Sequence, residues 1–306
     1  MKRLIAIVGP TGVGKSRLAL RLAGRFHGEI VSADSRQVYR HLDIGTAKPT
    51  PREMAAVPHH LIDIVNPDED FSLARYQALA YHAISDIHRR QRLPFLVGGS
   101  GLYVRAVLEG WRVPGVLPDP QFRYNIEERA REIGVDGLYR ELVSIDPEAA
   151  GKIDPRNVRR VVRALEVYAG TRQKFSRLGG KKAPDFDAHI IGLTADRAEL
   201  YRRVDERVDA MMARGLVAEV EKLREMGYDF KLPAMSGIGY RQVGQYLAGG
   251  LTLDEAGRRM KTETHRFIRH QYAWFRLRDE KIHWYDVGRQ DEAAIEEALA
   301  DYLEKE

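Results

Sequence analysis

Five short apolar runs along the chain have the length of β-strands and lack a clean alternation of apolar and polar positions. They are LIAIVG (4–9), EIVSAD (29–34), HLIDIV (60–65), PFLVGGS (94–100) and HIIGLT (189–194). Runs without alternation are typical of strands that are buried on both faces. Stretches with helical periodicity, 15–26 and 72–92, lie between them. This alternation predicts an α/β fold, a parallel sheet flanked by helices.

The strand pattern is interrupted between about 115 and 185, where helical periodicity replaces it. The stretch VPGVLPDP at 113–120 is typical of a linker, and GGKKAPDFD at 179–187 precedes the return of the strand pattern. Helices are expected at about 121–133, 137–144, 155–169, 196–226, 239–248 and 253–278. The pattern therefore predicts a core formed by 1–114 and 186–306, with an all-helical domain, 115–185, inserted into it.

The first apolar run leads directly into GPTGVGKS, which has the spacing of a P-loop. Its glycines allow backbone N–H groups to turn inward around phosphate oxygens, and the following helix directs its positive end to the same place. Lys15 neutralises phosphate charge, and the Ser16 hydroxyl is a candidate ligand for Mg²⁺. The candidate phosphate-binding residues are Gly9, Pro10, Thr11, Gly12, Val13, Gly14, Lys15 and Ser16. The motif specifies a polyphosphate in a P-loop NTPase-like fold, and does not specify ATP.

The acidic residue that a P-loop ATPase places after a second apolar strand is missing here. LPFLV (93–97) runs into GGSGLY (98–103), which offers one hydroxyl, Ser100, and no carboxylate. An acid instead follows the run at 29–34, as Asp34. Because the carboxyl ends of parallel strands meet at one edge, Asp34, Ser100 and the phosphate loop are expected to converge. Each side chain also has a structural alternative, Asp34 as a helix N-cap and Ser100 as a turn residue.

Composition narrows the class of protein. The chain has 306 residues, 44% hydrophobic and 30% charged, as in ordinary globular proteins. It has no cysteine, which excludes disulfides and cysteine-bound zinc, and its ten histidines show no metal-ligand spacing. No apolar run approaches the roughly 18–20 residues that cross a bilayer, so no membrane span is expected. The net charge of +5 weakly favours an anionic partner.

Two basic helices are candidate surfaces for such a partner. In the first, Arg156, Arg159, Arg160 and Arg163 recur at helical spacing on one face, and the opposite, packed face carries Val158, Val161, Val162 and Leu165. A solvated basic face is the alternative. In the second, THRFIRHQYAWFRLR (264–278), basic and aromatic residues are interleaved. Ile268, Tyr272 and Phe275 fall at i, i+4 and i+7 and are expected to pack in the core rather than to stack on bases.

Six segments resemble the tRNA isopentenyltransferase, or tRNA dimethylallyltransferase, family. They are ADSRQVYRHLDIGTAKP (33–49), HHLIDI (59–64), GGSGLY (98–103), RRVVRALEVY (159–168), RVDERVDAMMARGLVAEV (203–220) and GIGYRQ (237–242). The resemblance runs in order from about residue 4 to 285. It implies transfer of a dimethylallyl group from dimethylallyl diphosphate to N6 of the adenine just 3′ of the anticodon in tRNA, with diphosphate leaving and Mg²⁺ assisting.

The same resemblance implies roles for individual residues. Lys15, Ser16 and Arg207 would bind diphosphate or its metal, Asp34 would receive the N6 proton, and Ser100 would stand near the bridging oxygen or the target amine. The implied contacts with the tRNA anticodon stem-loop are Asp34, Ser35, Arg36, Gln37, Ser100, Arg123, Arg159, Arg160, Val161, Val162, Arg163, Gly239, Tyr240, Arg241, Arg269, Gln271 and Trp274.

Five positions depart from the family pattern. Ser100 replaces a common threonine and keeps the hydroxyl. Arg36 stands where an apolar residue is common. The usual Lys-Arg-Gln-x-Thr-Trp is here Arg-His-Gln-Tyr-Ala-Trp, with His270 at its second position. The basic and aromatic character of this segment remains.

Three other functions are alternatives. A small-molecule P-loop kinase also places an aspartate after its second strand, but it needs an arginine-bearing lid over ATP and generally lacks a basic insertion. A cytokinin-type adenylate isopentenyltransferase would leave the basic insertion and GIGYRQ unexplained. A non-catalytic RNA-binding protein would not need Lys15 and Asp34. Because eukaryotic relatives often append a Cys/His zinc finger, the absence of cysteine indicates the bacterial type, expected to be a cytoplasmic monomer.

Overall fold

The computed structural model describes residues 2–116, 118–288 and 292–304. The chain divides into two compact units. The core unit comprises Met1–Phe71, Tyr76–Leu108 and Asp185–Glu306, and the helical unit comprises Ser72–Arg75 and Glu109–Pro184. The division by contacts therefore falls at 109 and 185, whereas the sequence pattern places the boundaries at 115 and 186. No helix in the described part of the chain combines the length and apolar character that a membrane crossing requires.

The core unit is built on a six-stranded sheet in which every pairing is parallel. Its strands are β1 (Arg3–Val8), β2 (Gly28–Ser32), β3 (His59–His60), β4 (Leu93–Val97), β5 (Asp187–Thr194) and β6 (Ile282–Asp286), in the order β3-β2-β4-β1-β5-β6. β1 lies between β4 and β5, with Ile7 paired to Val97 and to Ile191. The predicted fold class, a P-loop-like parallel sheet flanked by helices, is confirmed.

Two strand predictions are corrected. The strand expected at 60–65 is limited to His59–His60, because Leu61 and Asp63 have φ angles of 65° and 55° that break an extended conformation. β6 was not expected, although IHWYD is rich in β-forming aromatic residues. It is an edge strand with one buried side chain, Ile282, so the apolar run that would reveal it is too weak.

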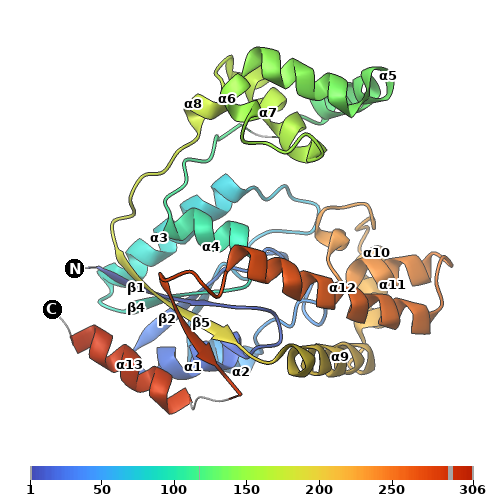
Figure 1. Ribbon diagram of the computed structural model, residues 1–306. Coiled ribbons are helices and arrows are strands. Elements are labelled where there is room, and N and C mark those ends of the chain that lie inside the picture. Colours follow the sequence, from blue (N-terminus) through green and yellow to red (C-terminus); the bar gives the residue numbers. More distant parts are fainter. Residues whose placement is uncertain (1, 117, 289–291, 305–306) are drawn as a thin grey trace. The chain divides into compact units, whose positions relative to one another are not determined.

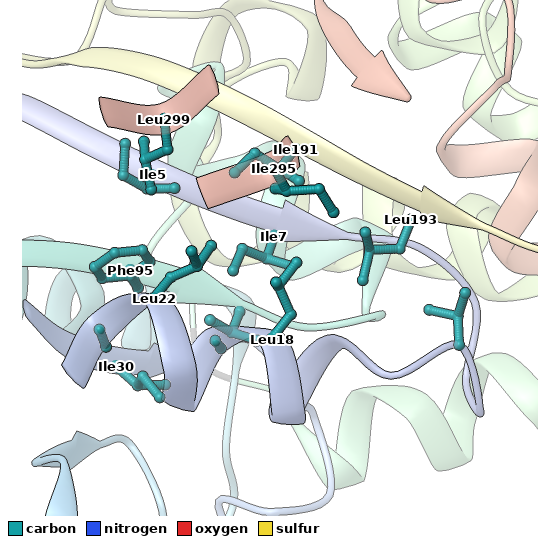
Figure 2. Close-up of a cluster of buried hydrophobic side chains, with 14 of the residues drawn as sticks. Ile5, Ile7, Leu18, Leu22, Ile30, Phe95, Ile191, Leu193, Ile295 and Leu299 are labelled. Carbon is teal, nitrogen blue, oxygen red and sulfur yellow. The ribbon is translucent and has the colours of Figure 1, made fainter. Parts of the chain in front are cut away.

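Helices cover both faces of the sheet (Figure 1). The helices of the core unit are α1 (Lys15–Arg25), α2 (Pro51–Ala56), α3 (Leu73–Arg89), α4 (Gly101–Leu108), α9 (Arg197–Ala213), α10 (Leu216–Glu225), α11 (Tyr240–Leu247), α12 (Leu253–Trp274) and α13 (Glu292–Glu304), with a short 3₁₀ turn, η1 (Ala234–Ser236). Figure 2 shows Leu18 and Leu22 of α1 and Leu299 of α13 beside Ile5 and Ile7 of β1, all within one buried cluster. This packing fixes the start of α1 against the end of β1.

The helical unit has its own hydrophobic core. Its helices are α5 (Pro120–Ile145), α6 (Pro147–Ala150), α7 (Val158–Thr171) and α8 (Phe175–Leu178). Gly134, at φ 73°, kinks α5 between the two helices that periodicity predicts there. Val161 is 0% exposed and packs with Leu138 and Leu142. The Val161 side chain therefore belongs to the packed face of α7, and contact of this residue with tRNA remains a prediction.

Candidate active site

One cavity in the core unit, of about 600 Å³, contains the chemistry that the sequence pattern indicates. The phosphate loop, Asp34 and Ser100 all line it. Strand register explains their meeting, because Ser32 of β2 and Ile7 of β1 both pair with Val97 of β4. The three strands thus end level with one another, and the turns that follow them lie at one edge of the sheet. The expected convergence is confirmed.

The phosphate loop depends on glycine at specific positions. Gly9 has φ 138°, and a Cβ there would lie 2.4 Å from the Leu193 carbonyl oxygen. Gly14 has φ 104° and begins α1 in the left-handed region, where an L-side chain is strained. Lys15 Nζ donates to the Pro10 carbonyl oxygen, at 2.7 Å, so its side chain folds back along the loop. The first-turn N–H groups of α1 and the Lys15 ammonium therefore face the same cavity.

Two cationic side chains share this cavity. Burial and the neighbouring Arg207 guanidinium lower the pKa of Lys15 to about 7, with Asp34 acting in the opposite direction. Burial also lowers the pKa of Arg207, and Asp34 partly offsets this effect. Two like charges in a partly desolvated site repel each other and favour the binding of an anion between them. The site is therefore suited to a diphosphate.

Diphosphate binding is expected to take up a proton at Lys15. In the free protein this amine is largely neutral above pH 7, and a bound anion raises its pKa. Affinity for inorganic diphosphate should therefore fall as pH rises above about 7, by up to about tenfold per pH unit. Calorimetry at pH 8 in two buffers of different ionisation enthalpy measures the uptake. Equal uptake by wild type and Lys15→Met, which controls for titration of diphosphate itself, would contradict this expectation.

Asp34 accepts hydrogen bonds that hold the turn after β2, and it also lines the cavity. Its Oδ1 accepts hydrogen bonds from the backbone N–H groups of Arg36, at 2.8 Å, and Gln37, at 3.4 Å. The alternative of a capping role is thus partly realised, since this oxygen holds the turn after β2. Its carboxylate nevertheless lies close enough to Lys15 and Arg207 to affect the pKa of both. One residue therefore both shapes the turn and supplies negative charge to the site.

Ser100 joins the turns that follow β2 and β4. Its Oγ accepts a hydrogen bond from the Ser35 N–H, at 3.1 Å, and lies 3.4 Å from Ser35 Oγ. The close approach of the turns requires Gly98, where a Cβ would lie 2.2 Å from the Ala33 carbonyl oxygen. The hydroxyl is thus held beside the Asp34 turn.

Arg36 and Gln37 use their side chains to hold the cavity walls. The Arg36 guanidinium donates to the carbonyl oxygens of Pro233, at 2.5 Å, and Ala234, at 3.3 Å, and to Ser236 Oγ, at 3.0 Å. The departure at position 36 therefore ties the Asp34 turn to η1. Gln37 Nε2 donates to two carbonyl oxygens of the 43–47 segment, which lines the same cavity. Contact of either residue with tRNA remains a prediction.

Gln271 of α12 also lines the cavity. It is 3% exposed, and it links the two glycine-rich loops. Its Oε1 accepts from the Thr11 N–H, at 2.9 Å, and its Nε2 donates to the Gly99 carbonyl oxygen, at 3.0 Å. Both polar ends are thus hydrogen-bonded within the protein, and contact of Gln271 with tRNA remains a prediction. A Cβ on Gly99 would lie 2.2 Å from this amide, so the packing leaves no room there.

Tyr240 is also enclosed, at 1% exposure, and its hydroxyl donates to Glu219. Tyr240 nevertheless lines the cavity, and its contact with tRNA remains a prediction. The neighbouring Gly239, at φ 99°, is buried at the start of α11, whereas Arg241 is exposed and paired with Glu263.

The second basic helix divides into a packed and an exposed face. Ile268 and Phe275 are buried and Tyr272 is partly buried against the sheet, which confirms the expectation that they belong to the core. Arg269 is exposed and donates to the Tyr201 hydroxyl. Trp274 is exposed along one edge and packs against Gly101, where a Cβ would lie 2.2 Å from its ring.

The arginines on the basic face of α7 differ in exposure and in their partners. Arg159 and Arg160 are exposed. Arg163 donates to the buried carboxylate of Glu166 and to the Val116 carbonyl oxygen, and Arg123 forms a bidentate pair with the same Glu166. Two of the predicted tRNA-binding arginines therefore also stabilise the helical unit, and Arg159 and Arg160 are the better probes of RNA binding.

Several cavity residues were not identified from the sequence. An apolar wall is formed by Val204, Val208 and Met211 of α9, Met260 of α12 and Ile238, and Phe267 stands at the exposed rim. Their helical spacing is the same as that of ordinary core positions, so periodicity does not reveal that they line a cavity.

Magnesium fits this site only as a partner of the substrate. In the described ranges, no three His, Asp or Glu side chains are grouped so that they could hold a metal ion. Mg²⁺ is commonly held by one or two protein oxygens together with substrate phosphates and water. The exposed Ser16 hydroxyl at the start of α1 lines the cavity and can serve as such a ligand.

Comparisons with known proteins agree with this geometry. A family model described as IPP transferase matches residues 37–278, and one described as isopentenyl transferase matches residues 2–64. The chain is 58% identical over 273 residues to a tRNA dimethylallyltransferase of Roseiflexus sp. (strain RS-1), which covers 89% of this chain and 90% of that protein. It is 51% identical over 300 residues to one of Dehalococcoides mccartyi, with 98% and 92% covered.

Solved structures are similar over the whole chain. The crystal structure of a full-length tRNA isopentenylpyrophosphate transferase from Bacillus halodurans is 42% identical, with a TM-score of 0.74, and the match covers 100% of this chain and 98% of that one. A eukaryotic dimethylallyltransferase captured acting on tRNA is 30% identical, with a TM-score of 0.81, and 99% and 80% of the two chains are covered.

Proposed function

The chain belongs to the IPP transferase family, and from this premise we propose that it transfers a dimethylallyl group from dimethylallyl diphosphate to tRNA. The acceptor is N6 of the adenine on the 3′ side of the anticodon, and the products are N6-(dimethylallyl)adenosine and diphosphate. The observation that carries this proposal is that one cavity holds both a phosphate loop and the carboxylate of Asp34. A hydrolase would instead need an acid after β4, where the chain has GGSGLY.

In this reaction the electron pair of the adenine amine attacks the allylic carbon, and the bond from that carbon to the diphosphate oxygen breaks. The leaving diphosphate gains negative charge in the transition state. Lys15, Arg207 and the N–H groups of the phosphate loop lie where they can stabilise it. Because these groups are already fixed by the fold, little reorganisation is needed as the charge develops.

The amine must lose a proton as the new carbon–nitrogen bond forms. Asp34 is the carboxylate that lines the cavity, and we assign it the role of proton acceptor. Ser100, held beside the Asp34 turn through Ser35, is placed to bond the amine or the bridging oxygen of the donor. When bound, Mg²⁺ would add positive charge at the diphosphate, with Ser16 as its protein ligand.

An adenine in a folded tRNA reaches such a cavity only if it leaves the base stack. The named relatives favour tRNA as the acceptor over a free adenine nucleotide or a small-molecule hydroxyl. A direct test measures diphosphate release together with nucleoside analysis of the tRNA. We expect one diphosphate for each modified adenine, whereas diphosphate release without modified tRNA would contradict the proposal. We further propose that the enzyme is a cytoplasmic monomer.

We propose that the exposed arginines of α7 bind the phosphates of the tRNA stem. Arg159→Ala combined with Arg160→Ala should weaken tRNA binding and reduce the slope of log affinity against log salt by about 1–2, since fewer counterions are released. Filter binding over a range of salt concentrations measures this slope. Lys152→Ala is the matched control, an exposed cation of the same unit that is paired with Glu148. An unchanged slope in the double variant would contradict the assignment.

A further inference from the structure

We propose that Glu219 of α10 is a positioning residue for the transfer reaction, acting through the 43–47 segment on the turn that carries Asp34. This inference rests on the proposed function, because its effect is expected on the chemical step. Glu219 lies in the segment 203–220, which carries part of the family resemblance, but that resemblance implies no role for it. Its side chain acts on the cavity wall through backbone groups and not through the substrate.

The Glu219 carboxylate is surrounded by donors. Its Oε2 accepts from the backbone N–H groups of Asp43, at 3.1 Å, and Ile44, at 2.7 Å. Its Oε1 accepts from the Gly45 N–H, at 3.2 Å, and from the Tyr240 hydroxyl, at 2.6 Å. Three consecutive backbone N–H groups thus converge on one anion. Hydrogen bonds to a charged acceptor are stronger than neutral ones, and this set determines the path of the segment.

The segment that Glu219 holds forms a wall of the cavity. Gly45, Thr46 and Ala47 line it. Gly45 lies flat against the buried ring of Tyr240, where a Cβ would approach to 2.5 Å. Ala47 has φ 47°, a left-handed conformation that is unfavourable for an L-residue and persists only where surrounding contacts impose it. The backbone conformation of this segment is therefore determined by its contacts with the surrounding structure.

Gln37 carries this constraint to Asp34. Its Nε2 donates to the carbonyl oxygens of Thr46, at 3.3 Å, and Ala47, at 3.4 Å. Its Oε1 accepts from Ser32 Oγ, and its backbone N–H donates to Asp34 Oδ1, at 3.4 Å. A contiguous set of hydrogen bonds thus runs from Glu219 through the segment and Gln37 to the carboxylate that we assign as proton acceptor.

A second set of contacts, made by Lys48, also holds this segment, so loss of the Glu219 charge should affect the cavity wall and not the whole fold. The ammonium of Lys48 is 5% exposed and donates to the Tyr39 carbonyl oxygen, at 2.8 Å, and to Asp43 Oδ1, at 2.6 Å, and also contacts Asp63. These contacts attach both Asp43 and the chain at Lys48 without the help of Glu219. Loss of the Glu219 charge should therefore shift the wall and leave the fold in place.

The chemistry of the four donors requires a carboxylate. In Glu219→Gln, one oxygen remains as acceptor, and the amide NH₂ faces donors that it cannot accept from. Burial and the Glu219 carboxylate raise the pKa of Tyr240 far above its usual value, so its hydroxyl remains a donor at neutral pH. Tyr240→Phe removes only one of the four donors and leaves the backbone groups bound.

The test compares wild type, Glu219→Gln, Tyr240→Phe and Glu225→Gln, an exposed control on the same helix. Single-turnover transfer to unmodified tRNA is measured beside calorimetric binding of inorganic diphosphate. We expect the rate of Glu219→Gln to fall about 10–100-fold, as for a misplaced catalytic group, with diphosphate affinity unchanged. Tyr240→Phe should lose less, and Glu225→Gln should match wild type.

A transfer rate for Glu219→Gln within twofold of active wild type would overturn the inference. A loss of rate matched by an equal loss of diphosphate affinity would overturn it as well, because it would indicate a general disruption of the site. If Glu219→Gln does not fold, Tyr240→Phe decides, because the inference requires a slower rate with unchanged diphosphate affinity in that variant. Absence of transfer by wild type would instead contradict the proposed function.

Discussion

Replacing Asp34 by asparagine is expected to lower turnover by about 10²–10⁴-fold, the range for loss of a general base. Asparagine keeps the size of the side chain, and its Oδ1 can still accept from the Arg36 and Gln37 N–H groups that hold the turn. The variant therefore removes the proton acceptor without removing the cap. Affinity for tRNA should change by less than about tenfold, because no stem contact is lost.

Single-turnover kinetics with saturating tRNA separates this effect from binding. Asp68→Asn is a suitable control, since it removes the same charge from an exposed position outside the cavity. Near-normal turnover by Asp34→Asn would show that the carboxylate only orients the turn.

Lys15→Met should lower kcat/KM by about 10²–10³-fold, the effect of removing a donor to a developing anion. The same substitution should raise the free energy of unfolding. The pKa of Lys15 is about 7 in the fold and near 10.5 in an unfolded chain, so the unfolded chain binds more protons between these values. Lys15 therefore lowers the free energy of unfolding of wild type by the full amount below pH 7, and this loss of stability disappears as the pH approaches 10.5. The stability gained by Lys15→Met should decrease over the same range.

Urea unfolding at pH 6.5 and 9.5 measures this gain, and steady-state kinetics measures the loss of activity. Lys222→Met, an exposed lysine near the end of α10, is the control for removing a surface charge. A Lys15→Met protein that is inactive and also less stable at pH 6.5 would contradict the assigned electrostatics, because its inactivity would then follow from disruption of the loop.

Much of the fold is encoded locally. The strands β1, β2, β4 and β5 are apolar runs that need burial on two faces, and their positions follow from this pattern. β6 is not predicted by this pattern, because an edge strand with one buried side chain lacks such an apolar run. The shortening of β3 depends on backbone angles at Leu61 and Asp63 that tertiary contacts impose, which no propensity predicts.

In the candidate site, too, some residues can be predicted from the sequence and others cannot. The phosphate loop, Asp34 and Ser100 are found because each directly follows a strand, and parallel strands end at one edge. Gln271 and Glu219 reach the site from α12 and α10, far along the chain. Both lie in segments that the family resemblance covers, but only the tertiary structure reveals which backbone groups they hold. The burial of the Val161 side chain follows from its spacing on α7, and the tRNA contact that the family resemblance implies for this residue remains a prediction.

The most direct test of the proposed function supplies purified protein, Mg²⁺ and labelled dimethylallyl diphosphate with unmodified tRNA, and offers AMP and ATP as parallel acceptors. The proposed function predicts label in tRNA only, at the adenine on the 3′ side of the anticodon. Label on AMP or ATP without label on tRNA would contradict it and assign the cavity to an adenine nucleotide. Transfer to none of the three would contradict it as well, and turnover of ATP would then be tested as the mark of a P-loop kinase.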